Sequence, residues 1–260
     1  MKKFIRTYLK TLLFFAMVGL IGGFFVGLYM LDSYPEEIKE QLIIEIEKVG
    51  LEQIPCEILI GIATAFQSAG YGLILGGFGI VLGKKTGLWK DERKIIKESI
   101  IPTIIISIVG GLLMILPDIL FFNNYSDALI NSYSKKPTVA YLLATITYAA
   151  VIEEVMLRLF LMSLIAFVIH RVFSKNKDLP TSGVLIASNI ISALIFALGH
   201  LPATFIIIGN TPLIILRCFL LNSGLGLLFG YLYQKHGLRY AMIAHGGCHL
   251  VSKLIWILFI

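Results

Sequence analysis

The chain has 260 residues, of which 57% are hydrophobic and 15% charged; its formal net charge is +6 and its mean hydropathy is +0.87. A soluble domain carries roughly a quarter charged residues, so this composition excludes an ordinary water-soluble globular protein. The apolar runs are continuous, which excludes a membrane β-barrel, and the basic residues lie between the runs, which excludes a nucleic-acid-binding patch. We therefore predict an all-α, polytopic bundle of transmembrane helices.

Seven apolar runs follow one another along the chain. They lie at about 11–31, 57–83, 100–122, 138–170, 184–208, 212–233 and 240–260. Each is long enough to cross a hydrocarbon core of about 30 Å. Counting 138–170 as one long or kinked helix gives seven spans, whereas dividing it gives eight. Seven agrees better with the charges of the loops, and we predict about seven.

The segments around the first run indicate how the chain begins. A basic stretch precedes the run and no A-x-A-like cleavage site follows it, so we expect a retained first span and not a removed signal peptide. Segment 32–57 is acidic and reads as an outside segment. The spacing of Ile38, Leu42 and Ile46 predicts an amphipathic helix near 36–52 that lies on the membrane surface.

Loops 84–98, 171–178 and 234–239 carry most of the remaining basic residues. Positive loops stay in the cytoplasm, so we expect these loops and the N-terminus to be cytoplasmic and the C-terminus to be outside. The short loops and the absence of eukaryotic retention signals favour a multi-pass protein of a prokaryotic plasma membrane.

Glycines and cysteines are read as packing residues. Four sets of glycines are spaced four apart: Gly19–Gly23–Gly27, Gly72–Gly76, Gly79–Gly83 and Gly226–Gly230. Such spacing lets helices approach closely in lipid. The three cysteines are Cys56, Cys218 and Cys248, without a C-x-x-C pair. We expect no disulfide framework and no thiolate metal site.

A few charged residues interrupt the apolar runs. They are Asp118, Glu153, Glu154, Arg158, Arg217 and Lys253. Asp118 and Arg217 lie near span ends, from where each side chain can extend to the interface. Glu154 and Arg158 are four apart with the acid first, which predicts a salt bridge on one helix face. Glu153 points about 100° away, so we expect it to face a different neighbour and to act as a general acid or base.

Polar side chains recur in the later runs. Asn189, Ser192, Phe196 and His200 are spaced to share one helix face. His245 and His249 form an i, i+4 pair on one face of the last run. Histidines beside a buried glutamate pair occur in hydrolytic sites and in proton relays.

Three motifs occur in order: Glu153-Glu154-Val-Met-Leu-Arg158, then Phe196-Ala-Leu-Gly-His200, then a motif that begins at His245. This set resembles the CPBP family of intramembrane proteases (CAAX protease and bacteriocin-processing, or Abi), which includes the type II CAAX prenyl endopeptidase. The resemblance covers about 138–252. It divides the chain into N-terminal transmembrane helices, 1–137, and a catalytic core, 138–260.

The resemblance implies roles for six residues. Glu153 and His200 would activate a water for attack on the scissile amide. Glu154 and Arg158 would hold the site together. His245 and the position of His249 would stabilise the oxyanion.

His249 departs from the family pattern, which has asparagine at its position. Histidine can donate, titrate or bind a metal. Glu153, His200, His245 and His249 are therefore an alternative zinc site, although the glutamate and histidine mechanism requires no cofactor. Because His200 and His245 fall at different depths in their runs, we expect broken helices, with breaks near Pro202 and Gly246–Gly247.

Three functions remain open from the sequence. The leading one is an intramembrane endopeptidase that cleaves a membrane-associated or lipid-modified protein. The second is a non-catalytic scaffold or immunity protein that binds another membrane protein, which His249 would favour as a sign of lost catalysis. The third is a proton-coupled carrier, against which stands the absence of two matching halves with broken helices.

Overall fold

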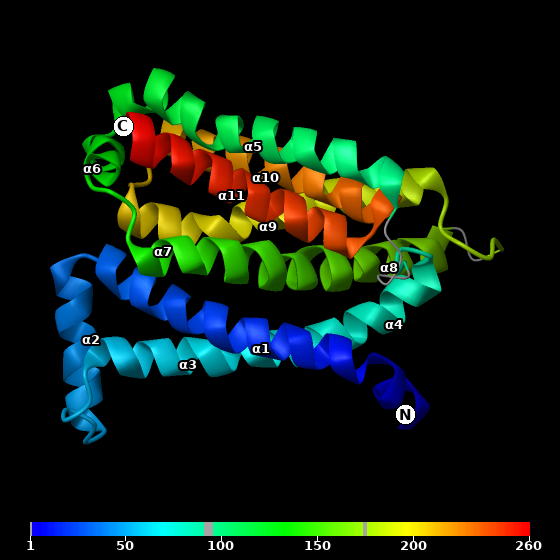
Figure 1. Cartoon of the computed structure of the whole chain (residues 1–260), viewed down its shortest axis with the longest axis horizontal. Coiled ribbons are helices and arrows are strands. Elements are labelled where there is room, and N and C mark those ends of the chain that lie inside the picture. The colour runs from blue at the N-terminus through cyan, green and yellow to red at the C-terminus, as the bar shows by residue number, and fades with distance from the viewer. Residues whose placement is uncertain (1, 91–95, 174–175) are drawn as a thin grey trace.

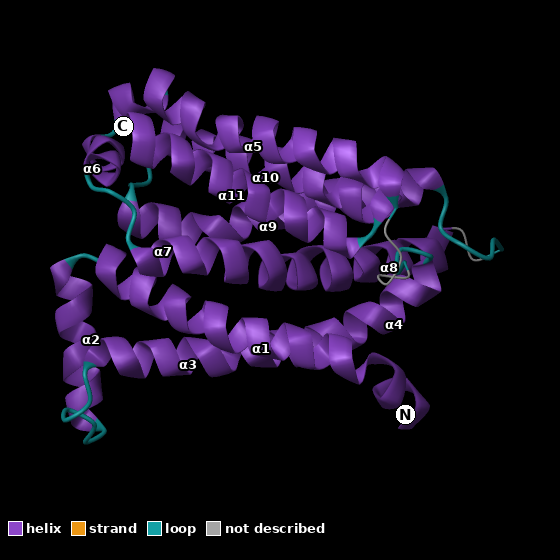
Figure 2. Ribbon diagram, viewed as in Figure 1, coloured by secondary structure: helices purple, strands orange, loops and turns teal. Residues whose placement is uncertain are grey.

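A computed structural model describes residues 2–90, 96–173 and 176–260, with the backbone alone for 2–5. Within these ranges every regular element is a helix and none is a strand (Figure 2). The predicted fold class, an all-α polytopic bundle, is confirmed. Arg93, Lys94 and Lys175, which contribute to the basic loops, lie outside the described residues.

The helical elements follow one another with short connections. They are α1 (Lys2–Ser33), α2 (Glu36–Lys48), α3 (Cys56–Gly70), η1 (Tyr71–Leu75), α4 (Gly76–Thr86), η2 (Lys97–Ser99), α5 (Ile100–Leu120), η3 (Phe122–Tyr125), α6 (Asp127–Ser134), α7 (Val139–Ala144), η4 (Thr145–Glu153), η5 (Val155–Met162), α8 (Ser163–Phe173), α9 (Ser182–Ile207), α10 (Pro212–His236) and α11 (Leu238–Phe259). Of these, η1, η4 and η5 are π-helical and η2 and η3 are 3₁₀-helical.

Six candidate membrane spans in the described chain are long and apolar enough to cross a bilayer. They cover Arg6–Ser33, Cys56–Thr86, Lys97–Leu120, Ser182–Ile207, Pro212–His236 and Leu238–Phe259. The remaining predicted span, 138–170, forms one uninterrupted helical path from Val139 to Phe173 that alternates between α- and π-helical turns. The path has no break that would divide it into two crossings. The described chain therefore has six candidate spans, of which Cys56–Thr86 also contains a π-helical turn, and this further path of mixed helix type.

The long helices form two layers with the mixed path between them (Figure 1). The first layer contains α1, α3 and α4, and the second contains α5, α9, α10 and α11. Helix α1 packs on α3, while α5 packs on α11 and α9 on α10. The path α7–η4–η5–α8 contacts α1 and α4 of the first layer and α9 and α11 of the second. Its central position buries Ile152, Val155 and Leu159 among other helices, whereas Ile146 and Val168 on other faces of the path are exposed.

Threonine side chains set where three of the helices begin. The hydroxyls of Thr138, Thr181 and Thr211 each accept a hydrogen bond from the backbone N–H three residues later. These bonds satisfy amide groups that have no partner in the first helical turn. Helix α4 ends at Thr86 and is capped by Gly87, whose φ of 73° is the left-handed conformation that glycine adopts without strain.

The predicted role of the spaced glycines is confirmed where α1 meets α3. A Cβ atom at Gly19 would lie 2.6 Å from the carbonyl oxygen of Ser68, and one at Gly27 would lie 2.8 Å from the Cα of Gly61. Neither distance is possible for real atoms. Glycine at these positions lets the two backbones touch, which is how helices associate in lipid without a hydrophobic driving force.

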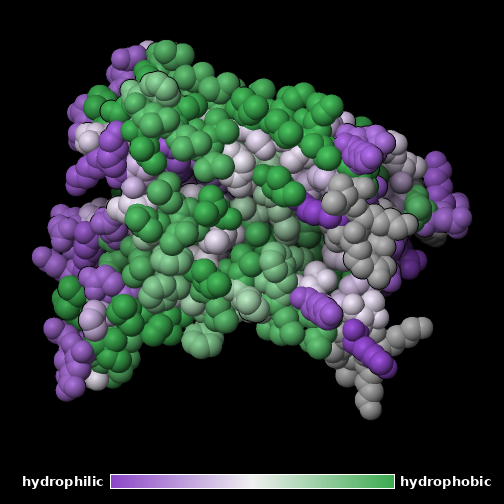
Figure 3. Space-filling model, viewed as in Figure 1, coloured by the Kyte–Doolittle hydropathy of each residue, from purple (hydrophilic) through white to green (hydrophobic). Residues whose placement is uncertain are grey.

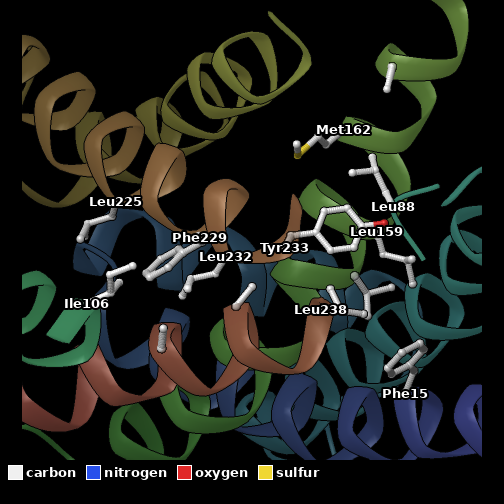
Figure 4. Packing of buried hydrophobic residues seen from close by; sticks show 14 of the residues in the cluster. Phe15, Leu88, Ile106, Leu159, Met162, Leu225, Phe229, Leu232, Tyr233 and Leu238 are labelled. Carbon is white, nitrogen blue, oxygen red and sulfur yellow. The ribbon is translucent and has the colours of Figure 1, made fainter. Parts of the chain in front are cut away.

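Buried apolar side chains fill the space between the mixed path and helices α10 and α11 (Figure 4). The labelled residues include Leu159, Met162, Phe229 and Tyr233, all of them buried. Cys218 and Cys248 are buried free thiols and Cys56 is a partly exposed one, as expected for cysteines that form no disulfide.

The surface has an apolar middle and polar ends (Figure 3). Hydrophobic residues cover the centre of the visible face, and hydrophilic residues gather at both ends of the long axis. The predicted amphipathic helix is α2, none of whose residues is buried, and it lies across the end of the bundle that carries the C-terminus (Figure 1). This distribution fits a bundle whose long axis crosses a bilayer, with the polar ends at the two membrane surfaces.

Candidate functional site

A cavity of about 430 Å³ lies between the layers, and four of the predicted site residues line it: Glu153, His200, His245 and His249. Their side chains come from η4, α9 and α11. Residues before position 137 also contribute to the wall, among them Tyr29 from α1 and Met114 from α5. The four residues are dispersed in the sequence, and only the bundle brings them to one cavity.

The π-helical path determines how the two glutamates point. Glu153 ends η4 and Glu154 follows it, just before η5 begins. A π-helix bonds i to i+5, so successive side chains diverge by less than the 100° of an α-helix. Both carboxylates therefore reach the same ring: Glu154 Oε1 lies 2.9 Å from His245 Nδ1, and Glu153 Oε2 lies 3.9 Å from His245 Nε2. As expected, Glu153 does not pair with Arg158 and faces the cavity, whereas Glu154 does not; the shared contact with His245 was not predicted.

Glu154 and Arg158 form the predicted salt bridge behind the cavity. Arg158 Nη1 lies 3.2 Å from Glu154 Oε1, with relative exposures of 1% and 0% for the two side chains. Arg158 Nη2 donates to the carbonyl of Gly226 at 3.0 Å, and its guanidinium packs over Phe196 and Phe229. Neither charged residue lines the cavity, so the pair supports the site and is not open to a substrate.

The His200 ring is held in one tautomer by its own helix. Its Nδ1 lies 2.9 Å from the carbonyl oxygen of Phe196, and a carbonyl only accepts, so Nδ1 carries the proton. In the neutral ring Nε2 then has a free lone pair. No described residue bonds to Nε2, and the ring lines the cavity. His200 therefore presents a proton acceptor to the cavity.

His245 and His249 stack on each other with ring centroids 5.1 Å apart, and His245 stacks on Phe229 at 4.4 Å. Glu154 accepts a hydrogen bond from His245 Nδ1, which leaves His245 Nε2 directed away from that carboxylate. His249 Nδ1 lies 3.4 Å from the Nζ of Lys253, one turn further along α11. The two rings thus form a short row along the cavity wall.

The expected helix breaks are wrong. Helix α9 continues through Pro202 to Ile207, and α11 runs through Gly246 and Gly247 without interruption. A Cβ at Gly246 would lie 3.2 Å from the Cβ of Ala150, so this glycine allows α11 to approach η4 closely. The irregular backbone is in η4 and η5 instead. In other proteins, π-helical turns inside α-helices frequently occur at functional sites.

Asp118 and Arg217 pair with each other, contrary to the expectation that each extends to the interface. Both nitrogens of the guanidinium edge, Nε and Nη2, donate to the two carboxylate oxygens of Asp118. The Tyr133 hydroxyl donates to the same carboxylate at 2.8 Å, and burial together with Asp118 raises the pKa of Tyr133. The bridge joins α5 to α10, and Arg217 lines the cavity.

Sequence reasoning gave Lys253 and Arg217 no place in the site, yet both line the cavity. The signal was present in each case, since a charged residue in an apolar run is costly unless it has a partner or a function. What the sequence lacked was the direction in which each side chain points.

The alternative zinc site does not fit this arrangement. In the described part of the chain, no group of three or more histidine, cysteine, aspartate or glutamate side chains is placed to hold a metal ion. His245 Nδ1 is engaged by Glu154, and its Nε2 is 3.9 Å from the nearest Glu153 oxygen. Zinc requires several nitrogen or oxygen atoms, each about 2.0–2.2 Å from the ion.

Comparison with known proteins gives one match. Residues 135–251 match the family model described as Type II CAAX prenyl endopeptidase Rce1-like. No curated protein and no solved structure shows significant similarity to the chain. The matched segment contains all six predicted site residues, from Glu153 to His249.

Proposed function

From the match of residues 135–251 to the Type II CAAX prenyl endopeptidase Rce1-like family, we propose that the protein is an intramembrane endopeptidase. Its substrate would be a membrane-associated or lipid-modified protein. The observation that carries the proposal is the position of the Glu153 carboxylate, which shares one cavity with His200 and His245. Hydrolysis inside a membrane bundle requires such a cavity, because water and the peptide must both reach the base.

Glu153 is proposed as the general base. Its side chain is 19% exposed and its Oε2 lies 3.9 Å from His245 Nε2, but no described residue forms a hydrogen bond with its carboxylate. It takes a proton from a water molecule, with His200 Nε2 as a second acceptor that orients the water. The hydroxide oxygen then bonds to the scissile carbonyl carbon, the C–N bond breaks, and the proton passes to the leaving amine.

His245 and His249 are proposed as donors to the oxyanion that forms on the carbonyl oxygen. Glu154 anchors the His245 ring through Nδ1, so that Nε2 faces away from this carboxylate; the ring would donate to the oxyanion through Nε2–H when both of its nitrogens carry a proton. Glu154 and Arg158 are positioning residues, since neither lines the cavity. No step in this scheme uses a metal.

The proposed topology places the N-terminus in the cytoplasm of a plasma membrane, as the basic loops favour. The cavity extends toward Tyr34 and Trp256, at the end of the bundle with the C-terminus and α2 (Figure 1). Under this topology, peptide enters from the non-cytoplasmic side or laterally from lipid.

The test is Glu153→Gln, which is nearly isosteric and cannot take a proton. Comparative peptidomics of cells that carry the wild type or Glu153→Gln would report both activity and substrate. We expect cleaved products to disappear in the variant while the protein level and its thermal stability are retained. Glu37→Gln, an exposed position on α2, is the matched control and should leave the product profile unchanged.

The second candidate function is a non-catalytic scaffold or immunity protein, which the histidine at position 249 favours. A scaffold would bind its membrane partner equally well with Glu153 or Gln at position 153. Identical peptide profiles together with unchanged partner binding would support the scaffold and reject the protease.

A further inference from the structure

A second hollow lies outside the catalytic cavity, and we call it the α1–α11 groove. Residues of α1, η4 and α11 line it, together with Trp89, which follows α4. Its volume is about 620 Å³, which is within the range of about 300–1,000 Å³ typical of sites for small ligands. None of the residues to which we assign a role in the reaction lines this groove.

The walls of the α1–α11 groove are mostly apolar and open to the outside of the bundle. Ile146 on η4 and Ile243 on α11 line it with relative exposures of 44% and 54%. Phe15 and Leu238 line its deeper part and belong to the buried apolar cluster (Figure 4). Because the exposed middle of this protein faces hydrocarbon, the groove is open to the chains of the surrounding lipids.

Two cations lie at one end of the groove. Lys10 precedes Phe14 by one turn of α1, and Arg239 precedes Ile243 by one turn of α11. Both helices run from the end of the bundle with the N-terminus toward the end with the C-terminus (Figure 1). Each cation is therefore nearer the N-terminal end than the apolar wall that follows it. Among the described residues that line the groove, none is acidic.

Aromatic side chains mark the cationic end as an interfacial position. Trp89 donates its backbone N–H to the carbonyl of Gly83 at 2.9 Å, and its ring meets that of Tyr8 edge-on with centroids 5.9 Å apart. The Nζ of Lys84 donates to the Tyr8 hydroxyl at 3.0 Å. Trp and Tyr concentrate where a membrane meets water. Under the proposed topology this end is cytoplasmic, and the cytoplasmic leaflet is the one that carries anionic lipids.

The length of the groove matches the upper part of an acyl chain. The seven-residue step along α11 from Arg239 to Gly246 rises about 10 Å. One leaflet contributes about half of a hydrocarbon core of about 30 Å. A lipid whose headgroup lies at the cationic end would thus place most of the leaflet depth of one chain along the apolar wall.

We propose that the α1–α11 groove binds one anionic phospholipid of the cytoplasmic leaflet, with its phosphate at Lys10 and Arg239 and one acyl chain along Phe14, Met242 and Ile243. The ammonium and the guanidinium would give charge-assisted hydrogen bonds to the phosphate oxygens. The order of the groove, cations at the interface and apolar side chains below them, is the order of headgroup and chain in a phospholipid.

The bound lipid would support one wall of the catalytic cavity. Ala150 and Val151 of η4 line the groove, whereas Ala149 and Glu153 of the same element line the cavity. A chain in the groove would fill the space between α1, η4 and α11 and so hold η4 in place. The lipid site itself does not depend on the proposed proteolysis.

Native mass spectrometry of the full chain in detergent, with equal amounts of phosphatidylglycerol and phosphatidylcholine of the same acyl chains, tests the proposal. We expect phosphatidylglycerol to bind about 10- to 30-fold more tightly, since two cations contact its anionic headgroup. Lys10→Gln/Arg239→Gln should remove this preference. Lys85→Gln/Lys235→Gln removes the same charge from exposed positions outside the groove and should retain it.

A second pair of variants tests the apolar wall and leaves the charge unchanged. Ile243→Trp fills the groove and should weaken phosphatidylglycerol binding about tenfold or more. Leu250→Trp is the matched control, because Leu250 lies on the same helix, has the same relative exposure of 54% and does not line the groove. Both positions are exposed, so both variants should fold, and thermal unfolding checks that they do. Neither this pair nor the wild-type lipid comparison needs the charge variant to fold.

The remaining arm separates a lipid headgroup from a free phosphate. Inorganic phosphate at millimolar concentration should neither displace phosphatidylglycerol nor raise the unfolding temperature; stabilisation by phosphate alone would overturn the lipid assignment. Equal binding of the two lipids, undiminished binding in Ile243→Trp, or an equal loss of preference in the control double variant would also overturn it. All of these measurements report binding, so their outcome is independent of whether the chain cleaves peptides.

Discussion

His245 donates a hydrogen bond from Nδ1 to Oε1 of Glu154 at 2.9 Å, and the same carboxylate oxygen lies 3.2 Å from Arg158. The contact joins the last helix to the π-helical path in the middle of the bundle. Through this contact Glu154, which does not line the cavity, orients the ring of His245, which does. Among the described residues no carboxylate contacts His200, whose Nδ1 is held by the backbone carbonyl of Phe196.

Glu154→Gln should keep the fold but lower turnover. An amide oxygen accepts a weaker hydrogen bond from His245 Nδ1–H than a carboxylate does and orients the ring less firmly, so we expect kcat to fall by about 100-fold or more with KM little changed. The measurement is steady-state cleavage of a substrate peptide identified by the peptidomics comparison. A pH profile of kcat that shifts relative to the wild type would show that the effect passes through His245. An equal fall in kcat with an unchanged profile would instead indicate general damage to the site.

His200→Gln should remove the acceptor that we assign to Nε2. The glutamine oxygen is a weaker and differently placed acceptor than imidazole Nε2, so the water is less well oriented for Glu153 and kcat should drop by about 10²-fold while the peptide still binds. Binding is read by anisotropy and cleavage by fluorescence. His236→Gln is the control, because that ring lies at the far end of α10 and contacts Ser99. Retention of wild-type kcat in His200→Gln would contradict the role of His200.

Asp118→Asn should destabilise the protein more than the charge-free double variant Asp118→Asn/Arg217→Gln. Removing one partner leaves Arg217 buried without its counter-charge, at a cost of about 3–5 kcal/mol, and the double variant relieves part of it. Thermal unfolding in detergent measures both. Equal stability of the single and double variants would mean that the bridge contributes nothing to the link between α5 and α10.

Metal chelation should leave cleavage unchanged. Among the described residues, no three ligating side chains are close enough together to hold a metal ion. The proposed reaction instead uses Glu153 and His200 directly. The measurement is the cleavage rate after incubation with EDTA or 1,10-phenanthroline, with metal content checked by mass spectrometry. Loss of activity that added Zn²⁺ restores would reject the metal-free scheme in favour of the zinc site.

Hydropathy, charge and residue spacing along the chain predicted several features that the structure bears out. The membrane helices, the surface helix α2 and the Glu154–Arg158 salt bridge all follow from patterns within one segment. The close contact of α1 with α3 likewise follows from the four-residue glycine spacing. Each depends on helical period and local composition, and these are properties that a single segment carries by itself.

Contacts between segments were decided only by the tertiary structure. The pairing of Asp118 with Arg217, the convergence of Glu153 and Glu154 on His245, and the direction of Lys253 depend on how helices pack and on where π-helical turns shift the register. A one-residue change in helical register turns a side chain by a large angle, and no local pattern in this sequence specifies that change. The sequence therefore determined which residues could do chemistry, and packing determined which of them share a cavity.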